Sequence, residues 1–278
     1  MSITKCIFPV AGFGTRFLPV TKVIPKEMLP ILTKPLIQYG VEEAISANLH
    51  EVTMITSKYK SAIKKHFEPH EEIEKLLKLT NKEKFLEEVN FVSSICKFNY
   101  LDQKKMLGLG HAIYTCKPQV GSESFAVILP DDLCVNDEDS VIQQMINIQK
   151  QHPDCCVVAV EQVPLEDISK YGVIKGELLP GSNNTFRVGD MVEKPNSVNA
   201  PSNLAIIGRY ILTNQIFEEV ERTLPDKNNE IQITDALSKL AKKGKVIAYK
   251  FTGKRFDCGT LKGFINATNY FANKHEIF

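Results

Sequence analysis

Short apolar segments with the composition of buried strands alternate along this chain with segments of helical periodicity. A strand followed by a helix and another strand favours a parallel sheet with helices on both faces, because each crossover places a helix over the sheet. The sequence therefore predicts an α/β fold with a mainly parallel open sheet flanked by helices. Strands are expected at residues 5–10, 51–55, 125–129, 155–160 and 246–251, and helices at 35–47, 111–118 and 141–151.

Two stretches depart from this alternation. Between residues 171 and 212, short strand-like segments are separated by Gly, Asn and Pro turns, which predicts a hairpin-rich elaboration. Residues 64–90 are charge-dense and helical by pattern, which fits either a solvated surface excursion or a subunit contact or lid. No repeat or low-complexity linker divides the chain. Residues 1–278 are therefore expected to form a single domain with a Rossmann-like sheet, ending in a helix that starts near Thr260.

Composition excludes several classes of protein. The net charge is +1, so the chain has no overall basic field to attract nucleic acid, and any anion site must be built locally. No apolar run approaches the roughly 20 residues that span a bilayer, and the N-terminal segment lacks the layout of a signal peptide. The seven cysteines include no C-x-x-C pair, so reduced, buried thiols and a cytoplasmic location are expected. Cys155 and Cys156 are adjacent on an expected strand and should point to opposite faces.

The first expected strand leads directly into A-G-F-G-T-R, residues 11–16, and then into P-K-E-M-L-P, residues 25–30. Glycines let the backbone approach an anion and aim N–H groups at it. The dinucleotide fingerprint would need a third glycine where Phe17 stands, and the ATPase pattern G-x-x-x-x-G-K-[ST] is absent. Arg16 and Lys26 supply cations instead. The pattern predicts a phosphate-binding loop rather than a tight turn with surface charges.

Carboxylates follow two of the strand-like segments. Asp131 and Asp132 end F-A-V-I-L-P-D-D, and Asp257 lies in F-D-C-G-T ahead of a helix. Ligands of open α/β sheets bind beyond the carboxyl ends of strands, and Mg²⁺ is commonly held by one or two carboxylates together with phosphates. From spacing alone, an exposed Asp-Asp turn remains the alternative.

Other candidate residues are ambiguous when taken singly. Glu193 and Lys194 are neighbours in V-E-K-P; on a strand they would point to opposite faces, which argues against an ion pair between them. A solvated edge is the simpler interpretation of that pair. Gln103 carries both a donor and an acceptor and can therefore pair with a pyrimidine edge. His111, near a helix start, suits either phosphate binding or helix packing.

The segment A-G-F-G-T-R-F-L-P-V-T-K-V-I-P-K-E-M-L-P resembles the signature of bacterial sugar-1-phosphate nucleotidyltransferases, and in particular the branch that uses UTP and glucose 1-phosphate. The resemblance extends in order over essentially the whole chain, through G-L-G-H-A-I, V-I-L-P-D-D, Y-G-V-I, V-E-K-P, G-R-Y-I-L, E-I-Q-I-T-D-A-L and F-D-C-G-T. It implies transfer of UMP from UTP to glucose 1-phosphate with release of pyrophosphate, Mg²⁺ as cofactor, and self-association as a dimer or tetramer.

The resemblance also assigns expected roles to residues. Arg16 and Lys26 would hold the triphosphate, Lys194 the attacking sugar phosphate. Asp131 and Asp257 would hold Mg²⁺. The implied nucleotide contacts are Ala11, Gly12, Gly14, Gln103 and Gly108, and the implied contacts to the sugar phosphate are Asp132, Gly172, Glu193 and Lys194.

Two other functions are compatible with parts of this pattern. One is a related nucleotidyltransferase that uses dTTP or another hexose 1-phosphate, since base preference rests on a few contacts. The other is a non-catalytic sensor that binds a nucleotide sugar. A sensor would have no need for Arg16, Lys26, Asp131, Lys194 and Asp257 together, and their joint presence favours an enzyme.

Overall fold

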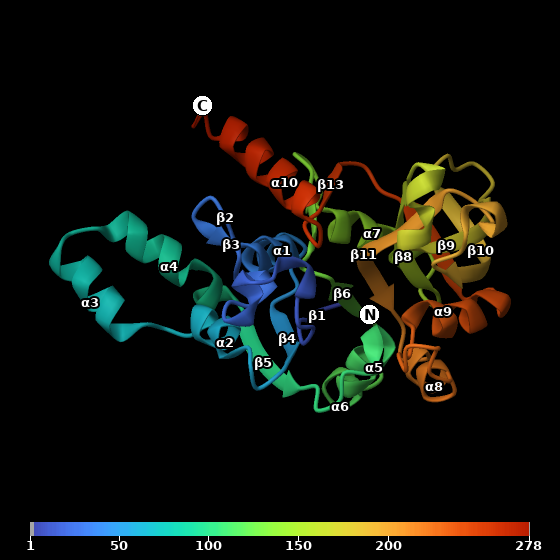
Figure 1. Ribbon diagram of the computed structural model, residues 1–278, viewed down its shortest axis with the longest axis horizontal. Coiled ribbons are helices and arrows are strands. Elements are labelled where there is room, and N and C mark those ends of the chain that lie inside the picture. Colours follow the sequence, from blue (N-terminus) through green and yellow to red (C-terminus); the bar gives the residue numbers. More distant parts are fainter. Residues whose placement is uncertain (1–2, 278) are drawn as a thin grey trace.

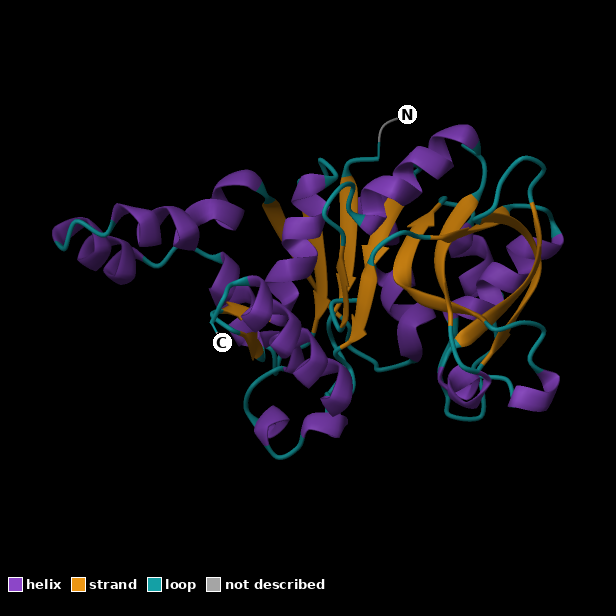
Figure 2. Cartoon of the chain, turned by 90° about the horizontal axis from the view of Figure 1, so that it is seen from above, coloured by secondary structure: helices purple, strands orange, loops and turns teal. Residues whose placement is uncertain are grey.

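The computed structural model describes residues 3–277 and is built around a nine-stranded sheet (Figures 1 and 2). Its strands are β1 (Lys5–Pro9), β4 (Glu51–Thr56), β5 (Lys97–Asp102), β6 (Phe125–Ile128), β8 (Cys156–Gln162), β9 (Gly172–Leu178), β10 (Thr185–Glu193), β11 (Leu204–Leu212) and β12 (Val246–Lys250). They lie in the order β5-β4-β1-β6-β11-β8-β12-β10-β9. The first four are mutually parallel, and β8 is parallel to β12, whereas β9, β10 and β11 run antiparallel to their neighbours.

The far half of the sheet curls back on itself. Strand β9 pairs with β10 along most of its length and also meets β11, where Ala205 opposes Val173. Strands β11, β8, β12, β10 and β9 thereby form a closed, barrel-like ring, visible in Figure 2. Two small ribbons complete the strands: β2 (Pro30–Ile31) with β3 (Lys34–Pro35), and β7 (Asp132–Val135) with β13 (Lys254–Asp257).

Helices cover both faces of the main sheet and create two separate cores. Residues of α1 (Leu36–Ser46), α2 (Ser61–Phe67) and α7 (Val141–Gln151) pack in one core, and residues of α5 (Gly108–Thr115), α6 (Lys117–Val120), α8 (Ile216–Glu221) and α9 (Ile233–Lys242) in the other. Cys155 belongs to the first core and Cys156 to the second, so the prediction that they point to opposite faces is confirmed. The C-terminal helix α10 (Leu261–Lys274) is capped by Thr260, whose side chain accepts from the N–H of Gly263.

The structure confirms the predicted α/β fold and places the expected strands within two residues of their predicted ends. The stretch 171–212 is only partly a hairpin elaboration. Strands β9 and β10 form the expected antiparallel hairpin, but β11 lies in the middle of the main sheet, between β6 and β8. The reason is that eight of its nine residues are buried, a pattern that suits a central strand covered on both faces.

The charged segment forms a helical projection, which we define as α3 (Glu71–Leu79) and α4 (Glu83–Ile95). It extends away from the sheet beyond α2, as both views show (Figures 1 and 2). None of the α3 residues is buried, and Val92 is the one buried residue of α4. The predicted helical character is thus confirmed. Among the described residues, no helix is both long and apolar enough to cross a membrane.

A buried ion pair joins two helices on one face of the sheet to its central strands. Arg209 of β11 is 1% exposed, and its Nε and Nη2 donate to the carboxylate of Glu43 on α1 at 3.1 and 2.7 Å. The Arg209 Nη1 also donates to the carbonyls of Leu129 and Gly208. Glu43 accepts a further bond from the backbone N–H of Ile142 at the start of α7. The pair therefore links α1, α7, β11 and the end of β6.

We predict that Glu43→Ala lowers the free energy of unfolding by about 3–5 kcal/mol, because it leaves the Arg209 guanidinium buried without a counter-charge. Urea denaturation followed by circular dichroism measures the loss. The matched control is Glu218→Ala, which removes an exposed ion pair with Arg222 and should change stability by less than about 0.5 kcal/mol. Equal effects of the two substitutions would contradict the structural role of Glu43.

Candidate active site

The glycine loop follows β1 at the edge where the parallel strands end. Gly14 has φ 66°, in the left-handed region, and a side chain on it would lie 3.0 Å from the Cβ of Lys26. Nothing lies within 4 Å of the position that a Gly12 side chain would take. Thr21 donates from its hydroxyl to the carbonyl of Gly14 at 2.8 Å. The loop thus packs against the Lys26 stem at Gly14 and leaves open space at Gly12 for a ligand to approach the backbone.

Lys26 pairs with the first of the aspartates. Its Nζ lies 2.5 Å from Asp131 Oδ2, and both side chains keep about a quarter of their surface exposed. Burial acts to raise the pKa of Asp131, but the charge and hydrogen bond of Lys26 outweigh it and hold that pKa below its ordinary value. Burial likewise acts to lower the pKa of Lys26, and the charges of Asp131 and Glu27 raise it overall. Both groups are therefore charged.

The next residue of the same loop, Glu27, forms a separate buried ion pair. Glu27 is 1% exposed, and Lys60 donates to its two carboxylate oxygens at 2.9 and 2.7 Å. Lys60 is 6% exposed and lies in the loop that follows β4. This buried pair ties the P-K-E-M-L-P segment to the neighbouring strand end. Lys26 is thereby held at a defined place at the edge of the sheet.

Asp131, Asp257 and Arg16 converge on Gly259. A side chain at this position would lie 3.0 Å from Asp257 Oδ1, 3.1 Å from Asp131 Oδ2 and 3.2 Å from Arg16 Nη1. Asp257 stands at the end of β13, and the N–H of Gly259 donates to its Oδ1. A side chain here would crowd the point where two carboxylates and a guanidinium meet and would move them by a few tenths of an ångström.

The two carboxylates fit a magnesium site. Burial and the negative charges of Asp132 and Asp131 raise the pKa of Asp257, and Arg255 and the Gly259 N–H offset this only in part, so an added cation would be favourable at this point. Among residues 3–277, no cluster of three or more His, Cys, Asp or Glu side chains could hold a metal. One or two carboxylates with substrate phosphates are the usual donors for Mg²⁺, whereas a zinc site would require more protein ligands.

A second group of predicted residues gathers at the end of β10. Glu193 Oε2 accepts from the hydroxyl of Thr234 at 2.6 Å, and Glu193 Oε1 lies 3.1 Å from Lys194 Nζ. The expectation that Glu193 and Lys194 point apart without pairing is wrong. Lys194 follows the last residue of the strand and has φ 45°, which turns it out of the alternating pattern. Gly172 is needed beside them, since a side chain there would lie 2.9 Å from Thr234 Oγ1.

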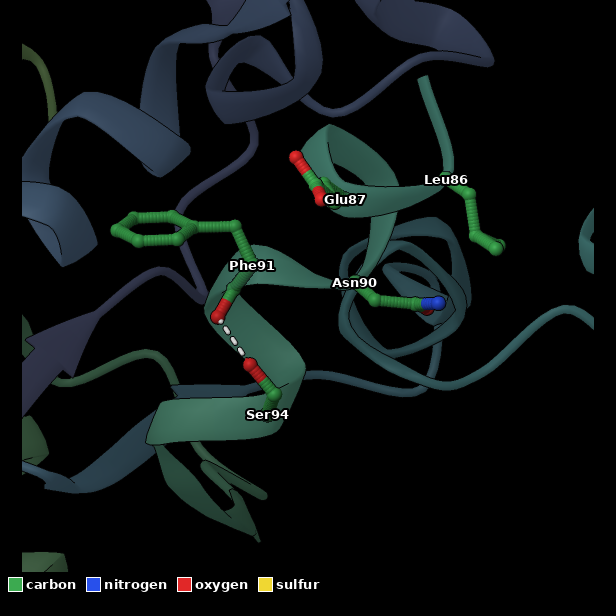
Figure 3. A pocket seen from close by; sticks show the side chains of 5 residues that line it. All are labelled: Leu86, Glu87, Asn90, Phe91 and Ser94. Atoms are coloured by element: carbon green, nitrogen blue, oxygen red, sulfur yellow. Dashed lines mark hydrogen bonds between the residues drawn. The ribbon is translucent and has the colours of Figure 1, made fainter. Parts of the chain in front are cut away.

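These two groups line one cleft of about 440 Å³. The predicted site residues among its lining are Arg16, Lys26, Asp132, Gly172, Glu193 and Lys194. Asp131 and Asp257 adjoin it through their contacts with Lys26 and Gly259. Another hollow, shown in Figure 3, lies on α4 and is lined by Leu86, Glu87, Asn90, Phe91 and Ser94. Its only charged lining residue is acidic, so it does not suit a phosphate.

The nucleotide contacts expected at Gln103 and Gly108 lie beside this cleft. Gln103 is 5% exposed, and its Nε2 lies 3.3 Å from the carbonyl of Gly108 and 3.1 Å from His111 Nδ1. Gly108 has φ 87°, and a side chain there would lie 2.9 Å from Glu230, itself a lining residue. With Nε2 occupied internally, Gln103 Oε1 is left as the acceptor toward a ligand. His111 is used to orient Gln103.

Comparison with known proteins places this site in a family. The model of the family described as nucleotidyl transferase matches residues 6–274. The chain belongs to the nucleotidyl transferase family. It is 54% identical over 269 residues to a UTP–glucose-1-phosphate uridylyltransferase of Pseudomonas aeruginosa, covering 96% of this chain and 95% of that protein. It is 44% identical to the Staphylococcus epidermidis protein of the same name, covering 98% of this chain and 93% of that protein.

Solved structures agree with this nucleotidyl transferase in fold. A crystal structure of UDP-glucose pyrophosphorylase complexed with UDP-glucose has a TM-score of 0.90 and 51% identity, covering 98% of this chain and 100% of that chain. A UTP-bound UGPase from Acinetobacter baumannii has a TM-score of 0.90 and 34% identity, covering 99% of this chain and 95% of that chain.

Four side chains in or beside this nucleotidyl transferase site escaped the sequence analysis. They are Glu27 and Lys60, which pair with each other, Thr234, which binds Glu193, and Arg255, which binds Asp132. Glu27 and Thr234 lie inside motifs that resemble the family, and Arg255 immediately precedes another. An acid beside Lys26 in a stiff, proline-bounded segment was a usable signal for Glu27. Lys60 carried no such signal, because its partner lies 33 residues away and only the fold brings them together.

We predict that Gly259→Ala lowers kcat/KM by about tenfold, because the methyl group displaces Asp257, Asp131 and Arg16 by a few tenths of an ångström. Steady-state kinetics of nucleotidyl transfer measures the loss, and thermal melting checks that the fold is kept. Gly189→Ala is the control, since the nearest atom to its added methyl is the Lys175 carbonyl at 3.9 Å. Wild-type kinetics in Gly259→Ala would show that the convergence at this residue is not used.

Proposed function

We propose that this nucleotidyl transferase transfers UMP from UTP to glucose 1-phosphate, giving UDP-glucose and pyrophosphate. The observation that carries the proposal is the convergence of Arg16, Asp131 and Asp257 on one point, beside a cleft that Lys26 and Lys194 also line. The names of the curated relatives, which match over nearly the whole chain, support it. The solved relatives with UDP-glucose and with UTP support the same substrate class.

The chemistry of this site is the approach of two anions. A glucose 1-phosphate oxygen attacks the α-phosphorus of UTP in line, the bond to the β-phosphate oxygen breaks, and pyrophosphate leaves without a covalent enzyme intermediate. Arg16 and Lys26 bind the triphosphate, and Lys194 binds the attacking phosphate. Such transfers are catalysed mainly by positioning and by neutralisation of charge. Asp131 and Asp257 would hold Mg²⁺, which would supply positive charge to offset that of the phosphates.

Lys26 must change partners when UTP binds. Lys26 is paired with Asp131, and a triphosphate would offer stronger anionic partners at the same edge. The buried Glu27–Lys60 pair keeps the backbone of Lys26 in place during this exchange. On the sugar side, Glu193 and the backbone of Gly172 contact hydroxyls, and Asp132 remains a predicted sugar contact. Ala11, Gly12 and Gly14 line the open loop where the nucleotide approaches.

Base choice rests on Gln103. Its Nε2 faces Gly108 and His111, so its Oε1 is free to accept from the N3–H of uracil. We expect pyrophosphate release with UTP in preference to dTTP, CTP, ATP and GTP, and with glucose 1-phosphate in preference to other hexose 1-phosphates.

Gln103→Leu should raise the KM for UTP about 5- to 150-fold, because a buried polar group of the base loses its partner.

The full panel of nucleotides and sugar phosphates, assayed by pyrophosphate release, is the experiment that tests the function. A preference for dTTP or for another sugar would replace the assignment with that of a related nucleotidyltransferase. No release with any pair would indicate a sensor.

In Gln103→Leu, the KM for glucose 1-phosphate should stay near its wild-type value. A change that affects only the saturation curve for the sugar phosphate would refute the uracil contact.

We predict that Lys194→Ala retains UTP binding but loses turnover by about 10²- to 10³-fold, since it removes one preorganised charge from the sugar-phosphate side. Calorimetric titration with UTP and steady-state kinetics separate the two effects. Lys175→Ala, an exposed lysine on the adjacent strand β9, is the matched control and should behave as wild type. An equal loss of UTP affinity in Lys194→Ala would instead place this lysine on the nucleotide.

We also propose that the protein self-associates through the helical projection. Six large apolar side chains are exposed on it: Ile73, Leu76, Leu79, Phe85, Val89 and Phe91. Short helices obtain most of their stability from packing of an apolar face. The apolar side chains of α3 and α4 remain largely exposed to solvent within the described chain. A second copy fits the surface, because the projection carries both acidic and basic residues and a two-fold interface pairs such a patch with itself.

The hollow on α4 provides a receptor for a partner side chain within this interface. It measures about 490 Å³, and the Phe91 carbonyl on its wall accepts from the Ser94 hydroxyl at 2.8 Å (Figure 3). We predict that replacing Leu76 and Leu79 together by Glu lowers the molar mass measured by light scattering to that of the monomer. Leu224→Glu, at a residue 84% exposed outside the projection, should leave the mass unchanged. A monomeric wild type, or an unchanged mass in the double variant, would contradict this interface.

The cytoplasm is the compartment we propose for the reaction. All seven cysteines are free thiols, and six of them are buried. Burial raises the pKa of Cys116 and Cys134 to about 12, so these thiols stay protonated and unreactive near neutral pH. A reducing compartment is consistent with this state.

A further inference from the structure

Arg255 is a buried cation that the proposed reaction does not use. It lies on β13, two residues before Asp257, and its side chain is 6% exposed. Residues two apart on a strand face the same side, so Arg255 and Asp257 project toward the same region. In the antiparallel ribbon, Asp257 pairs with Asp132 of β7, which makes Arg255 a diagonal neighbour of that aspartate. A guanidinium therefore stands beside the aspartates without lining the cleft.

The principal partner of Arg255 is Asp132. The Nε and Nη2 of Arg255 both lie 2.6 Å from Asp132 Oδ1, and Nη1 lies 3.2 Å from Glu161 Oε2. The other oxygen of Asp132, Oδ2, accepts from the N–H of Gly208 at 2.7 Å. Both oxygens of Asp132 thus have strong donors. Although Asp132 is adjacent to Asp131 in sequence, its charge is already compensated.

Arg255 also supports Asp257 through an aromatic ring. Its guanidinium lies over the ring of Tyr171, 5.0 Å from the centroid, and the Tyr171 hydroxyl lies 3.5 Å from Asp257 Oδ2. The remaining oxygen of Asp257 accepts from Gly259. The stacked guanidinium keeps the ring in the orientation that brings its hydroxyl to Asp257. Arg255 thereby contacts one aspartate directly and orients another.

We propose that Arg255 is a positioning residue that withdraws Asp132 from metal binding and orients Asp257, so that a divalent cation is held by Asp131 and Asp257 alone. This inference rests on the proposed function, because it takes these two aspartates as the magnesium ligands. A site with two protein carboxylates leaves positions for substrate phosphates. A third carboxylate would add negative charge to the site and hold the cation more tightly.

The test uses Mn²⁺ as the probe and measures its binding to the nucleotide-free enzyme by electron paramagnetic resonance. Arg255→Met frees Asp132 beside the other two aspartates, and we expect it to bind Mn²⁺ about tenfold more tightly, the effect of roughly one pKa unit from an uncompensated neighbouring charge. Turnover should fall about 10- to 100-fold, as for other residues that orient metal ligands. A merely structural role for Arg255 would weaken binding and turnover together.

Two further variants complete the test. Arg255→Met combined with Asp132→Asn removes the freed carboxylate and should return Mn²⁺ affinity to near the wild-type value. Arg255→Lys, which keeps the charge, should lie between wild type and Arg255→Met and serves if the methionine variant does not fold. Unchanged or weaker Mn²⁺ binding in the Arg255 variants overturns the inference. If Asp131→Asn binds Mn²⁺ as well as wild type does, the metal assignment of the proposed function fails instead.

Discussion

The buried ion pair between Arg209 and Glu43 links the hydrophobic core to the segment that carries the site aspartates. Arg209 donates to the carbonyl of Leu129, two residues before Asp131, and to the carbonyl of Gly208, whose N–H binds Asp132. Removing two charges from water is costly unless every donor and acceptor is satisfied, and here a helix, a strand and a loop are all required to satisfy them. Asp131 and Asp132 follow β6, and the end of this strand therefore has a defined position. That position depends on the packing of α1, α7 and β11 around it.

The site built on this frame is a series of compensated charges. Lys26 accompanies Asp131, Lys60 accompanies Glu27, and Arg255 accompanies Asp132. Asp257 is the exception, and burial together with the neighbouring negative charges raises its pKa. Such an arrangement lets cations and carboxylates lie close together and leaves Asp257 as the carboxylate beside which an added cation would be favourable. Under the proposed function, substrate binding would exchange partners instead of creating isolated buried charges.

The sequence analysis predicted several residues that line the cleft. It misjudged contacts that depend on the local backbone conformation. Arg16 and Lys26 could be chosen because a glycine loop after a strand, followed by cations, has a direct physical reason. The Glu193–Lys194 pair was misjudged because strand alternation ends at Glu193 and Lys194 adopts a left-handed conformation, which no periodicity reveals. Strand β11 was likewise assigned to an elaboration, since its apolar run is equally compatible with an edge hairpin and a central strand until its neighbours are known.

The sequence by itself determined the elements, the family and the chemical types of the site residues, because periodicity, glycine loops and strand-end carboxylates are local properties of the chain. Tertiary structure alone decided which charges meet. Arg255 and Asp132 are separated by 123 residues, and Arg209 and Glu43 by 166. Their pairing follows from strand order and register, which are set by how two cores close on opposite faces of the sheet. Whether an aspartate is free to hold a metal ion or is already neutralised by an arginine is a property of that packing.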